Sequence, residues 1–311
     1  MPRAHFGPGP AVLAFDVGGT DVKSALVDAS GQVLGVRRTP APVHGENPAG
    51  RLAEALAHLQ ADYLATYPTV HPVAAGVSVP GIVDETTGVG ILAGNMGWRD
   101  APVRDLVGTA LGLPIAFGHD VRSAGAAEFA LGAAREYENV VVLAIGTGIA
   151  GAIIIDGKPY SAHGYAGEFG HALSDPNGDP CPCGAVGCLE TIASAGAIAR
   201  RYGAATGTVV RGARVVLEAA QAGDDVAQRV WNDAVDALAA ALARTAAILA
   251  PEAIVIAGGL SEAGDALFVP LQARLEQLLS FHRRPKLLRA QLGDDAGLLG
   301  TALAARRALV R

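Results

Sequence analysis

Three cysteines and one histidine form the most informative group of residues in the chain. All the cysteines of the sequence fall in one short stretch after His171, at Cys181, Cys183 and Cys188. Thiolates and an imidazole at this spacing favour a closed, tetrahedral Zn²⁺ site. A disulfide is the alternative, but it would leave one thiol over, and Cys181 and Cys183 are too close in sequence to pair easily. We therefore expect a structural zinc loop over residues 171–190.

Several carboxylates stand where they could do chemistry. Glu168 and Glu190 bracket the zinc loop, so this loop is expected to support a polar site. Asp16 ends a predicted strand just before a glycine turn, where a carboxylate can hold Mg²⁺, although Asp is also a common turn residue. Asp120 follows His119 between a predicted strand and a predicted helix. It is either a general base for a substrate hydroxyl or only the N-cap of that helix.

Two glycine-threonine turns each follow a predicted strand. Gly18-Gly19-Thr20 follows strand 11–17, and Gly146-Thr147-Gly148 follows strand 140–145. A further strand comes after each turn, so both are predicted hairpins. Their backbone N–H groups and threonine hydroxyls could clamp one triphosphate, and two ordinary β-turns are an equally good interpretation. The second turn also matches GxGxxG, but a β-branched strand follows where a dinucleotide-binding Rossmann site needs a helix.

The elements that must position these residues form an α/β pattern with an internal repeat. Strand, glycine-threonine turn, strand and Asp/Gly turn occur twice, which suggests two related domains. We place the boundary near residue 119, between a small N-terminal α/β domain (1–119) and a large C-terminal α/β domain (120–296) that carries the zinc loop. The last helix, about 297–311, is expected to pack back on the first domain.

Composition excludes several classes of protein. The 311 residues are 50% hydrophobic and 17% charged, so the chain can bury a core and is not disordered. A net charge of −6 argues against nucleic acid as the main partner. No apolar run is long and charge-free enough to span a bilayer, and the start, MPRAHFGPGP, is unlike a targeting peptide. We expect a cytoplasmic protein with a small-molecule substrate and no membrane or nucleic-acid partner.

The motifs also occur in a recognisable order. They are DVGGTDVKSALVD (16–28), Pro80-Gly81, His119-Asp120, LAIGTGIAGAIIIDGK (143–158), GEFGH (167–171), CxCGxxGCxE (181–190), AGG (257–259) and GDDAGLLGTA (293–302). In this order, over nearly the whole chain, they resemble the ROK family of sugar kinases and sugar-responsive repressors. GEFGH followed by CxCGxxGCxE is the most specific part of the resemblance.

The resemblance implies an α/β fold of the actin-like, ribonuclease-H-like ATPase type, with two α/β domains flanking a cleft, and usually a homodimer. It implies an ATP-dependent hexose kinase with ATP and Mg²⁺ as cofactors beside the structural Zn²⁺. ATP would be held by Gly18, Gly19, Thr20, Lys23, Thr147 and Gly148, with Gly258 and Gly259 near the adenosine and Mg²⁺ near Asp16. The sugar would contact Gly81, Asn95, His119, Asp120, Glu168, His171 and Glu190. Asp120 would deprotonate the 6-hydroxyl, and His171 would use one ring nitrogen on zinc and the other side on the sugar.

Three departures from the family pattern bear on these implications. His119 stands where most relatives have Asn, Ala150 and Ala152 replace glycines of the second turn, and Asp21 follows the first turn where many relatives have Lys or Asn. His119 leaves the sugar open between glucose, an N-acylhexosamine and an amino-glucose such as 3-amino-3-deoxyglucose (kanosamine). A neutral imidazole could serve as an acceptor for an amino group.

Other functions within the family are less favoured. A repressor would carry a winged-helix domain ahead of the first turn, and only fifteen residues precede Asp16. A non-catalytic sugar sensor would not need Asp120 and both glycine turns. Polyphosphate could replace ATP as phosphoryl donor, but the sequence has no obvious run of basic residues that would favour binding of such a polyanion.

Overall fold

The structure, a computed structural model, describes residues 6–42 and 45–309, which divide into two units. Unit 1 consists of the described residues of 1–135, 159–166 and 294–311, and unit 2 of residues 136–158 and 167–293. This division differs from the boundary expected near residue 119. Helix α3 (Asp120–Leu131) belongs to unit 1, because it packs there on the C-terminal helix α9 (Ala296–Ala308).

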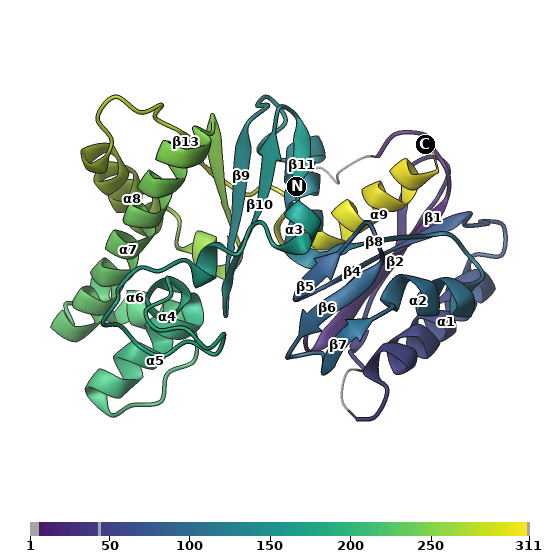
Figure 1. Cartoon of the computed structure of the whole chain (residues 1–311), viewed down its shortest axis with the longest axis horizontal. Coiled ribbons are helices and arrows are strands. Elements are labelled where there is room, and N and C mark those ends of the chain that lie inside the picture. Colours follow the sequence, from purple (N-terminus) through teal and green to yellow (C-terminus); the bar gives the residue numbers. More distant parts are fainter. Residues whose placement is uncertain (1–5, 43–44, 310–311) are drawn as a thin grey trace. The chain divides into compact units, whose positions relative to one another are not determined.

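The main sheet of unit 1 has the strand order β3-β2-β1-β4-β8 (Figure 1). Its strands are β1 (Val12–Val17), β2 (Asp21–Val27), β3 (Val33–Pro40), β4 (Ala74–Val79) and β8 (Ile115–His119), and its other helices are α1 (Pro48–Thr66) and α2 (Val103–Leu111). β1 pairs antiparallel with β2 and parallel with β4, and β4 pairs parallel with β8. The hairpin predicted around the first glycine turn is therefore confirmed.

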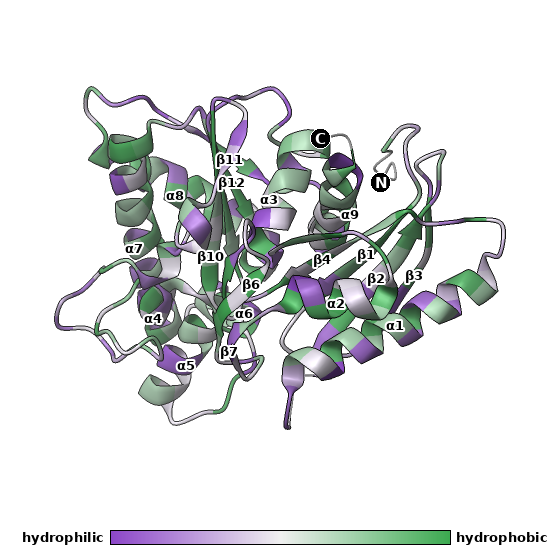
Figure 2. Ribbon diagram, turned by 45° about the vertical axis from the view of Figure 1, so that its right-hand side comes forward, coloured by the Kyte–Doolittle hydropathy of each residue, from purple (hydrophilic) through white to green (hydrophobic). Residues whose placement is uncertain are grey.

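Alternating residues of β1 face opposite sides of this sheet, as the pleat of a strand requires. Leu13 and Phe15 pack in the cluster that contains α1 and α2, whereas Ala14 packs in the cluster that contains α9. Figure 2 shows hydrophilic and hydrophobic residues alternating along α1, as expected for a helix with one buried side. Asp16 continues the series of Ala14, so the pleat directs this carboxylate to the α9 side of the sheet.

A second, three-stranded sheet in unit 1 has no counterpart in the sequence predictions. It consists of β5 (Ile82–Asp84), β6 (Val89–Ala93) and β7 (Trp98–Ala101). β5 is only three residues long, and its pairing with β6 shifts register between Ile82 and Val83. Such short, irregular strands leave no clear alternation of polar and apolar residues to detect.

A second five-stranded sheet, whose strands β9, β10, β12 and β13 lie in unit 2, repeats the order of the first as β11-β10-β9-β12-β13. Its strands are β9 (Val140–Ile145), β10 (Ile149–Ile155), β11 (Lys158–Tyr160), β12 (Ala253–Ala257) and β13 (Lys286–Arg289). β9 pairs antiparallel with β10 and parallel with β12, and β12 pairs parallel with β13. The matching topology confirms the α/β class and the internal repeat.

Five helices share the buried core of unit 2 with the strands of its sheet. They are the short α4 (Glu190–Ala193), α5 (Ala195–Thr206), α6 (Ala213–Gln221), α7 (Asp225–Leu249) and α8 (Asp265–Leu278). Leu143 and Ile145 of β9 share a buried cluster with Leu238 and Leu242 of α7. This core fixes the end of β9, from which the second glycine turn departs.

Candidate active site

Asp16 is held at the end of β1 by residues from two other elements of unit 1. Ser78, its partner in the register of β4, donates a hydrogen bond of 2.8 Å to Asp16 Oδ1. A Cβ on Gly297 of α9 would collide with Asp16 Oδ2, so only glycine lets the helix approach the carboxylate this closely. Burial raises the pKa of Asp16 to about 6, with the neighbouring Asp120 adding to the shift and Ser78 opposing it.

Asp120 is the first residue of α3 and not its N-cap. The cap is His119, whose Nδ1 accepts a hydrogen bond of 3.4 Å from the N–H of Arg122. The interpretation of Asp120 as a mere cap is therefore wrong. The Asp120 side chain keeps 29% of its surface exposed, and Oδ1 accepts the N–H of Val121 at 2.6 Å. Burial raises its pKa to about 6, which the Val121 N–H and Arg122 partly offset.

His119 itself is buried and uncharged. Its side chain is only 6% exposed, and burial together with the Arg122 guanidinium lowers its pKa to about 3. Its Nδ1 is engaged within unit 1, since it lies 3.4 Å from the backbone nitrogen of Arg122 and 3.3 Å from Asp120 Oδ1. That His119 offers an acceptor to an amino group on the sugar stays a prediction.

Two charged residues near Asp120, Arg122 and Glu85, were not among the predicted site residues. The Arg122 guanidinium is buried, donates to Glu85 Oε1 at 2.8 Å, and also binds the carbonyl oxygens of Val83 and Gly164. Glu85 in turn accepts the N–H of His119 at 3.4 Å. An arginine two residues after a candidate base was the only signal in the sequence, and its burial with Glu85 as partner is seen only in the structure.

The first glycine turn lies in unit 1 with several of the other predicted residues. Gly18 donates its N–H to Asp21 O at 2.7 Å, which closes the hairpin. A Cβ on Gly19 would lie 3.0 Å from Asn95 Nδ2, so these two predicted residues are neighbours, and Thr20 beside them is exposed.

Two further predicted residues of unit 1 are held in place by other elements. Lys23 Nζ donates to the Asp294 carbonyl and lies 3.3 Å from Asp295 Oδ1, so its ammonium group is tied to the segment before α9. Gly81 has a φ of 97° and packs on β6.

The second glycine turn lies in unit 2, next to Glu190. Gly146 donates its N–H to Gly148 O at 2.9 Å, and Thr147 is exposed. Glu190 Oε2 accepts the N–H of Ile149 at 2.7 Å. A carboxylate predicted to meet the sugar thus contacts the end of the predicted phosphate turn.

The four predicted zinc ligands lie close together in unit 2. The ligand atoms of His171, Cys181, Cys183 and Cys188 all lie within 4.8 Å of one another. His171 Nδ1 is 3.6 Å from Cys181 Sγ, and Cys183 Sγ is 3.6 Å from Cys188 Sγ. A tetrahedral Zn²⁺ site with Zn–S of about 2.3 Å and Zn–N of about 2.0–2.1 Å has ligand–ligand edges of about 3.6–3.8 Å. The donor set and the spacing therefore fit Zn²⁺.

The thiol chemistry of this cluster also favours a cation. Burial raises the pKa of Cys188 to about 12, and its two thiol neighbours add to the shift. Such a thiol ionises at neutral pH only when a positive charge stabilises the thiolate.

Because Nδ1 of His171 faces the thiols, Nε2 is the nitrogen left for another ligand. Glu168 precedes the 3₁₀ turn Phe169–His171, and the His171 N–H donates to its carbonyl at 3.0 Å.

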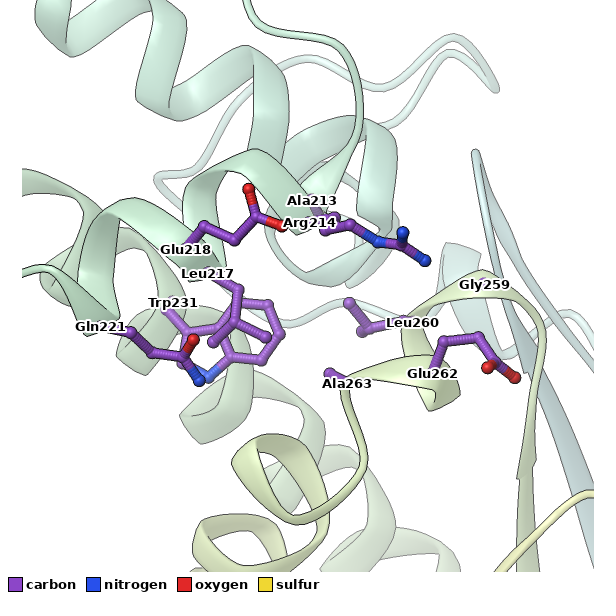
Figure 3. Close-up of a pocket in the computed structure, with 10 residues that line it drawn as sticks. All are labelled: Ala213, Arg214, Leu217, Glu218, Gln221, Trp231, Gly259, Leu260, Glu262 and Ala263. Atoms are coloured by element: carbon purple, nitrogen blue, oxygen red, sulfur yellow. The ribbon is translucent and has the colours of Figure 1, made fainter.

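A cavity of about 320 Å³ opens beside the last predicted motif, Gly258-Gly259 (Figure 3). Gly258 has a φ of 79°, and a Cβ there would lie 2.5 Å from the carbonyl oxygen of Ile145. Figure 3 shows the indole of Trp231 toward one end of the cavity and Arg214 and Glu262 toward the other. Apolar walls with a few polar groups suit a flat, partly polar ring.

The fold and these sites define a two-unit sugar-kinase fold of the actin-like ATPase type, which solved structures share. The ROK hexokinase of Thermus thermophilus has a TM-score of 0.85 at 32% identity, covering 96% of this chain and 99% of its own. A ROK-family glucokinase of Streptomyces griseus, in complex with glucose and AMPPNP, has a TM-score of 0.79 at 30% identity and the same coverage.

Sequence comparison gives the family directly. The ROK family model matches residues 12–308. Glucokinase of Streptomyces coelicolor is 30% identical over 94% of this chain and 97% of its own, and N-acetylmannosamine kinase of Yersinia pseudotuberculosis is 33% identical over 96% and 99%. The chain therefore belongs to the ROK family. Within residues 6–42 and 45–309, no helix has the length and apolar character needed to cross a membrane.

Proposed function

We propose that this chain transfers the γ-phosphoryl group of ATP to the 6-hydroxyl of a hexose, with Asp120 as general base. Its class, ATP-dependent sugar kinase, follows from family membership and from relatives named glucokinase and N-acetylmannosamine kinase. One observation carries the finer assignment. The Asp120 carboxyl is partly exposed at the start of α3, and its pKa is about 6.

A carboxyl group with this pKa suits the proposed step. At neutral pH it is mostly ionised and can accept a proton, yet it is a stronger base than an ordinary aspartate. Phosphoryl transfer asks little covalent chemistry of the protein and depends on positioning and on stabilising negative charge. Asp16, the other carboxylate with a raised pKa in this site, lies beside the first glycine turn and is proposed to support Mg²⁺. The charge of the bound Mg²⁺ would also keep Asp16 ionised.

ATP is proposed to bind through the two glycine turns and the cavity beside Gly259. The turns expose Thr20 and Thr147 and present backbone N–H groups, which are the donors that phosphates use. The cavity of about 320 Å³ has the mixed lining that suits an adenine ring. The complex of the Streptomyces griseus relative with AMPPNP supports ATP as the donor, and polyphosphate is the alternative to test.

Zn²⁺ is proposed to be structural, held by His171, Cys181, Cys183 and Cys188. A closed set of four protein ligands leaves no open position for chemistry. The metal would bind His171 Nδ1 and thereby fix the orientation of the ring, so that Nε2 points toward the sugar. The free nitrogen of a metal-bound histidine commonly binds a second partner in this way. Glu168, Glu190, Gly81 and Asn95 complete the proposed sugar contacts.

Glucose is the hexose that we favour. A buried, uncharged His119 supplies no charge to pair with an ammonium group, which suits a neutral sugar hydroxyl. The glucokinase relatives support the same choice, whereas the N-acetylmannosamine kinase relative supports an N-acylhexosamine as second candidate. Kanosamine is the third substrate to compare. We also propose a cytoplasmic homodimer, on the strength of the family resemblance alone.

A coupled ADP-release assay tests the proposal. Purified protein would be offered ATP or polyphosphate with glucose, N-acetylmannosamine, N-acetylglucosamine and 3-amino-3-deoxyglucose, and the product analysed for 6-phosphorylation. We expect ATP-dependent turnover with glucose at the highest kcat/KM. No turnover with any of these sugars and either donor would refute the kinase assignment, and the alternative of a non-catalytic sugar sensor would then predict sugar binding without ADP release.

A further inference from the structure

The segment that follows the last zinc ligand is joined to the second glycine turn at several points. Glu190 Oε2 accepts the N–H of Ile149 at 2.7 Å, and the N–H of Ala195 donates to Gly146 O at 2.8 Å. On the zinc side, Thr191 Oγ1 donates to the carbonyl of Cys188 at 2.7 Å. The backbone of residues 188–195 and its hydrogen bonds therefore connect a proposed zinc ligand to both ends of the turn.

The carboxylate of Glu190 lies directly against the turn. A Cβ on Gly148 would be only 2.5 Å from Glu190 Oε2, so a larger residue there would require the Glu190 side chain to shift. The glycine at this position thus makes room for the carboxylate as well as for a ligand. A residue expected to serve the sugar occupies a structural position in the predicted nucleotide site.

We infer that Glu190 is a positioning residue for the nucleotide, which holds the turn 146–148 in the shape that binds phosphate, and that the zinc loop preorganises this turn as well as the sugar contacts. This inference rests on the proposed function. The Ile149 N–H is fixed by Glu190, so the exposed Thr147 and the half-buried Gly148 are the part of the turn left to meet an anion.

The charge of Glu190 and its hydrogen bond to the turn should affect nucleotide binding in opposite directions. Two substitutions can therefore separate the two effects. A carboxylate beside a triphosphate is unfavourable electrostatically, whereas its hydrogen bond to the turn is favourable. Glu190→Gln keeps an oxygen acceptor for the Ile149 N–H and removes the charge. Glu190→Ala removes both, and loss of a charged hydrogen bond of this kind corresponds to roughly tenfold or more in an equilibrium constant.

The test measures binding of ADP and AMPPNP, each with Mg²⁺ and without sugar, by isothermal titration calorimetry on the zinc-loaded chain. We expect Glu190→Ala to weaken nucleotide binding about tenfold and Glu190→Gln to bind within about twofold of wild type or tighter. Removal of zinc by a chelator should weaken nucleotide binding in the same direction. Zinc content and thermal unfolding are recorded for each protein, so that a misfolded Glu190→Ala variant is recognised and the Gln and zinc-free arms decide.

Glu252→Ala is the matched control. Glu252 Oε2 also accepts backbone N–H groups in unit 2, from Glu138 and Asn139 at 2.7 and 2.9 Å, but at the opposite end of β9 from the turn. Its removal should lower thermal stability and leave nucleotide affinity within about twofold of wild type.

The possible outcomes separate the inference from the proposed function. Nucleotide binding by Glu190→Ala, or by the folded zinc-free chain, that equals wild type would overturn the inference while wild-type turnover still supports the kinase. A Glu252→Ala variant that loses as much nucleotide affinity as Glu190→Ala would also overturn it, because general loosening of unit 2 would then explain both. If the wild-type chain binds neither nucleotide, the proposed function itself fails.

Discussion

Replacing the proposed base by its amide should abolish activity and at the same time stabilise the protein at neutral pH. Asp120→Asn keeps the size of the side chain and an oxygen that accepts the Val121 N–H, as Asp120 Oδ1 does. It removes the proton acceptor, and a general base typically contributes about 10²–10⁴-fold in rate. We expect kcat to fall by at least about 100-fold, with a much smaller change in sugar affinity.

The magnitude of the stability effect follows from the raised pKa. The pKa of the folded-state carboxyl is about 6, against an ordinary value of 3.8. The folded state therefore favours the protonated form, and the favourable contribution is complete below pH 3.8 and is lost as pH rises through 6. A shift of roughly two units corresponds to at most about 3 kcal/mol. The amide does not ionise, so Asp120→Asn should gain up to about 3 kcal/mol over wild type between pH 4 and pH 7.5.

Chemical denaturation at both pH values measures this gain, and steady-state kinetics from pH 5 to 8 measures the base. Wild-type kcat/KM should fall as the pH drops through about 6, because Asp120 then becomes protonated and can no longer accept a proton. Asp265→Asn is the control, because Asp265 is likewise the first residue of a helix but is exposed to water. An Asp120→Asn protein that keeps more than about a tenth of wild-type kcat would refute the assignment of the base. A stability difference that does not change with pH would refute the raised pKa of Asp120.

Other perturbations test separate parts of the structure. Cys183→Ser should lose zinc, measured by mass spectrometry of the purified metal content, and melt at a lower temperature; full retention of zinc would contradict the tetrahedral site. Gly297→Ala should push the Asp16 carboxylate out of position and lower kcat/KM at least tenfold, and unchanged kinetics and Mg²⁺ dependence would show that Asp16 is not needed there. His119→Ala should lower the free energy of unfolding by about 1 kcal/mol, because α3 loses its cap, whereas His119→Asn should keep it; equal losses in urea denaturation would exclude the capping role.

The local features of the site could be predicted from the sequence because their causes are local. The proposed zinc loop is encoded by ligand types that lie close together in the chain, and the hairpin at Gly18–Thr20 is encoded by a glycine turn between two apolar strands. The repeat of this pattern after residue 140 predicted the second sheet. Even His119-Asp120 was recognisable as a strand-to-helix junction, although which of the two residues caps the helix was not.

The surroundings of each functional group were decided only by the tertiary structure. Asp16 meets Ser78 across a parallel strand pair and Gly297 across the sheet, and no local propensity couples residues so far apart in sequence. Burial created by that packing, and not residue type, raises the pKa of Asp16 and Asp120. For the same reason Glu190, which the sequence places with the zinc loop, contacts the second glycine turn only because the chain folds the loop back onto β10. Sequence specifies which groups are available within a few residues, whereas the packing of sheets and helices specifies which of them meet and how strongly they hold their protons.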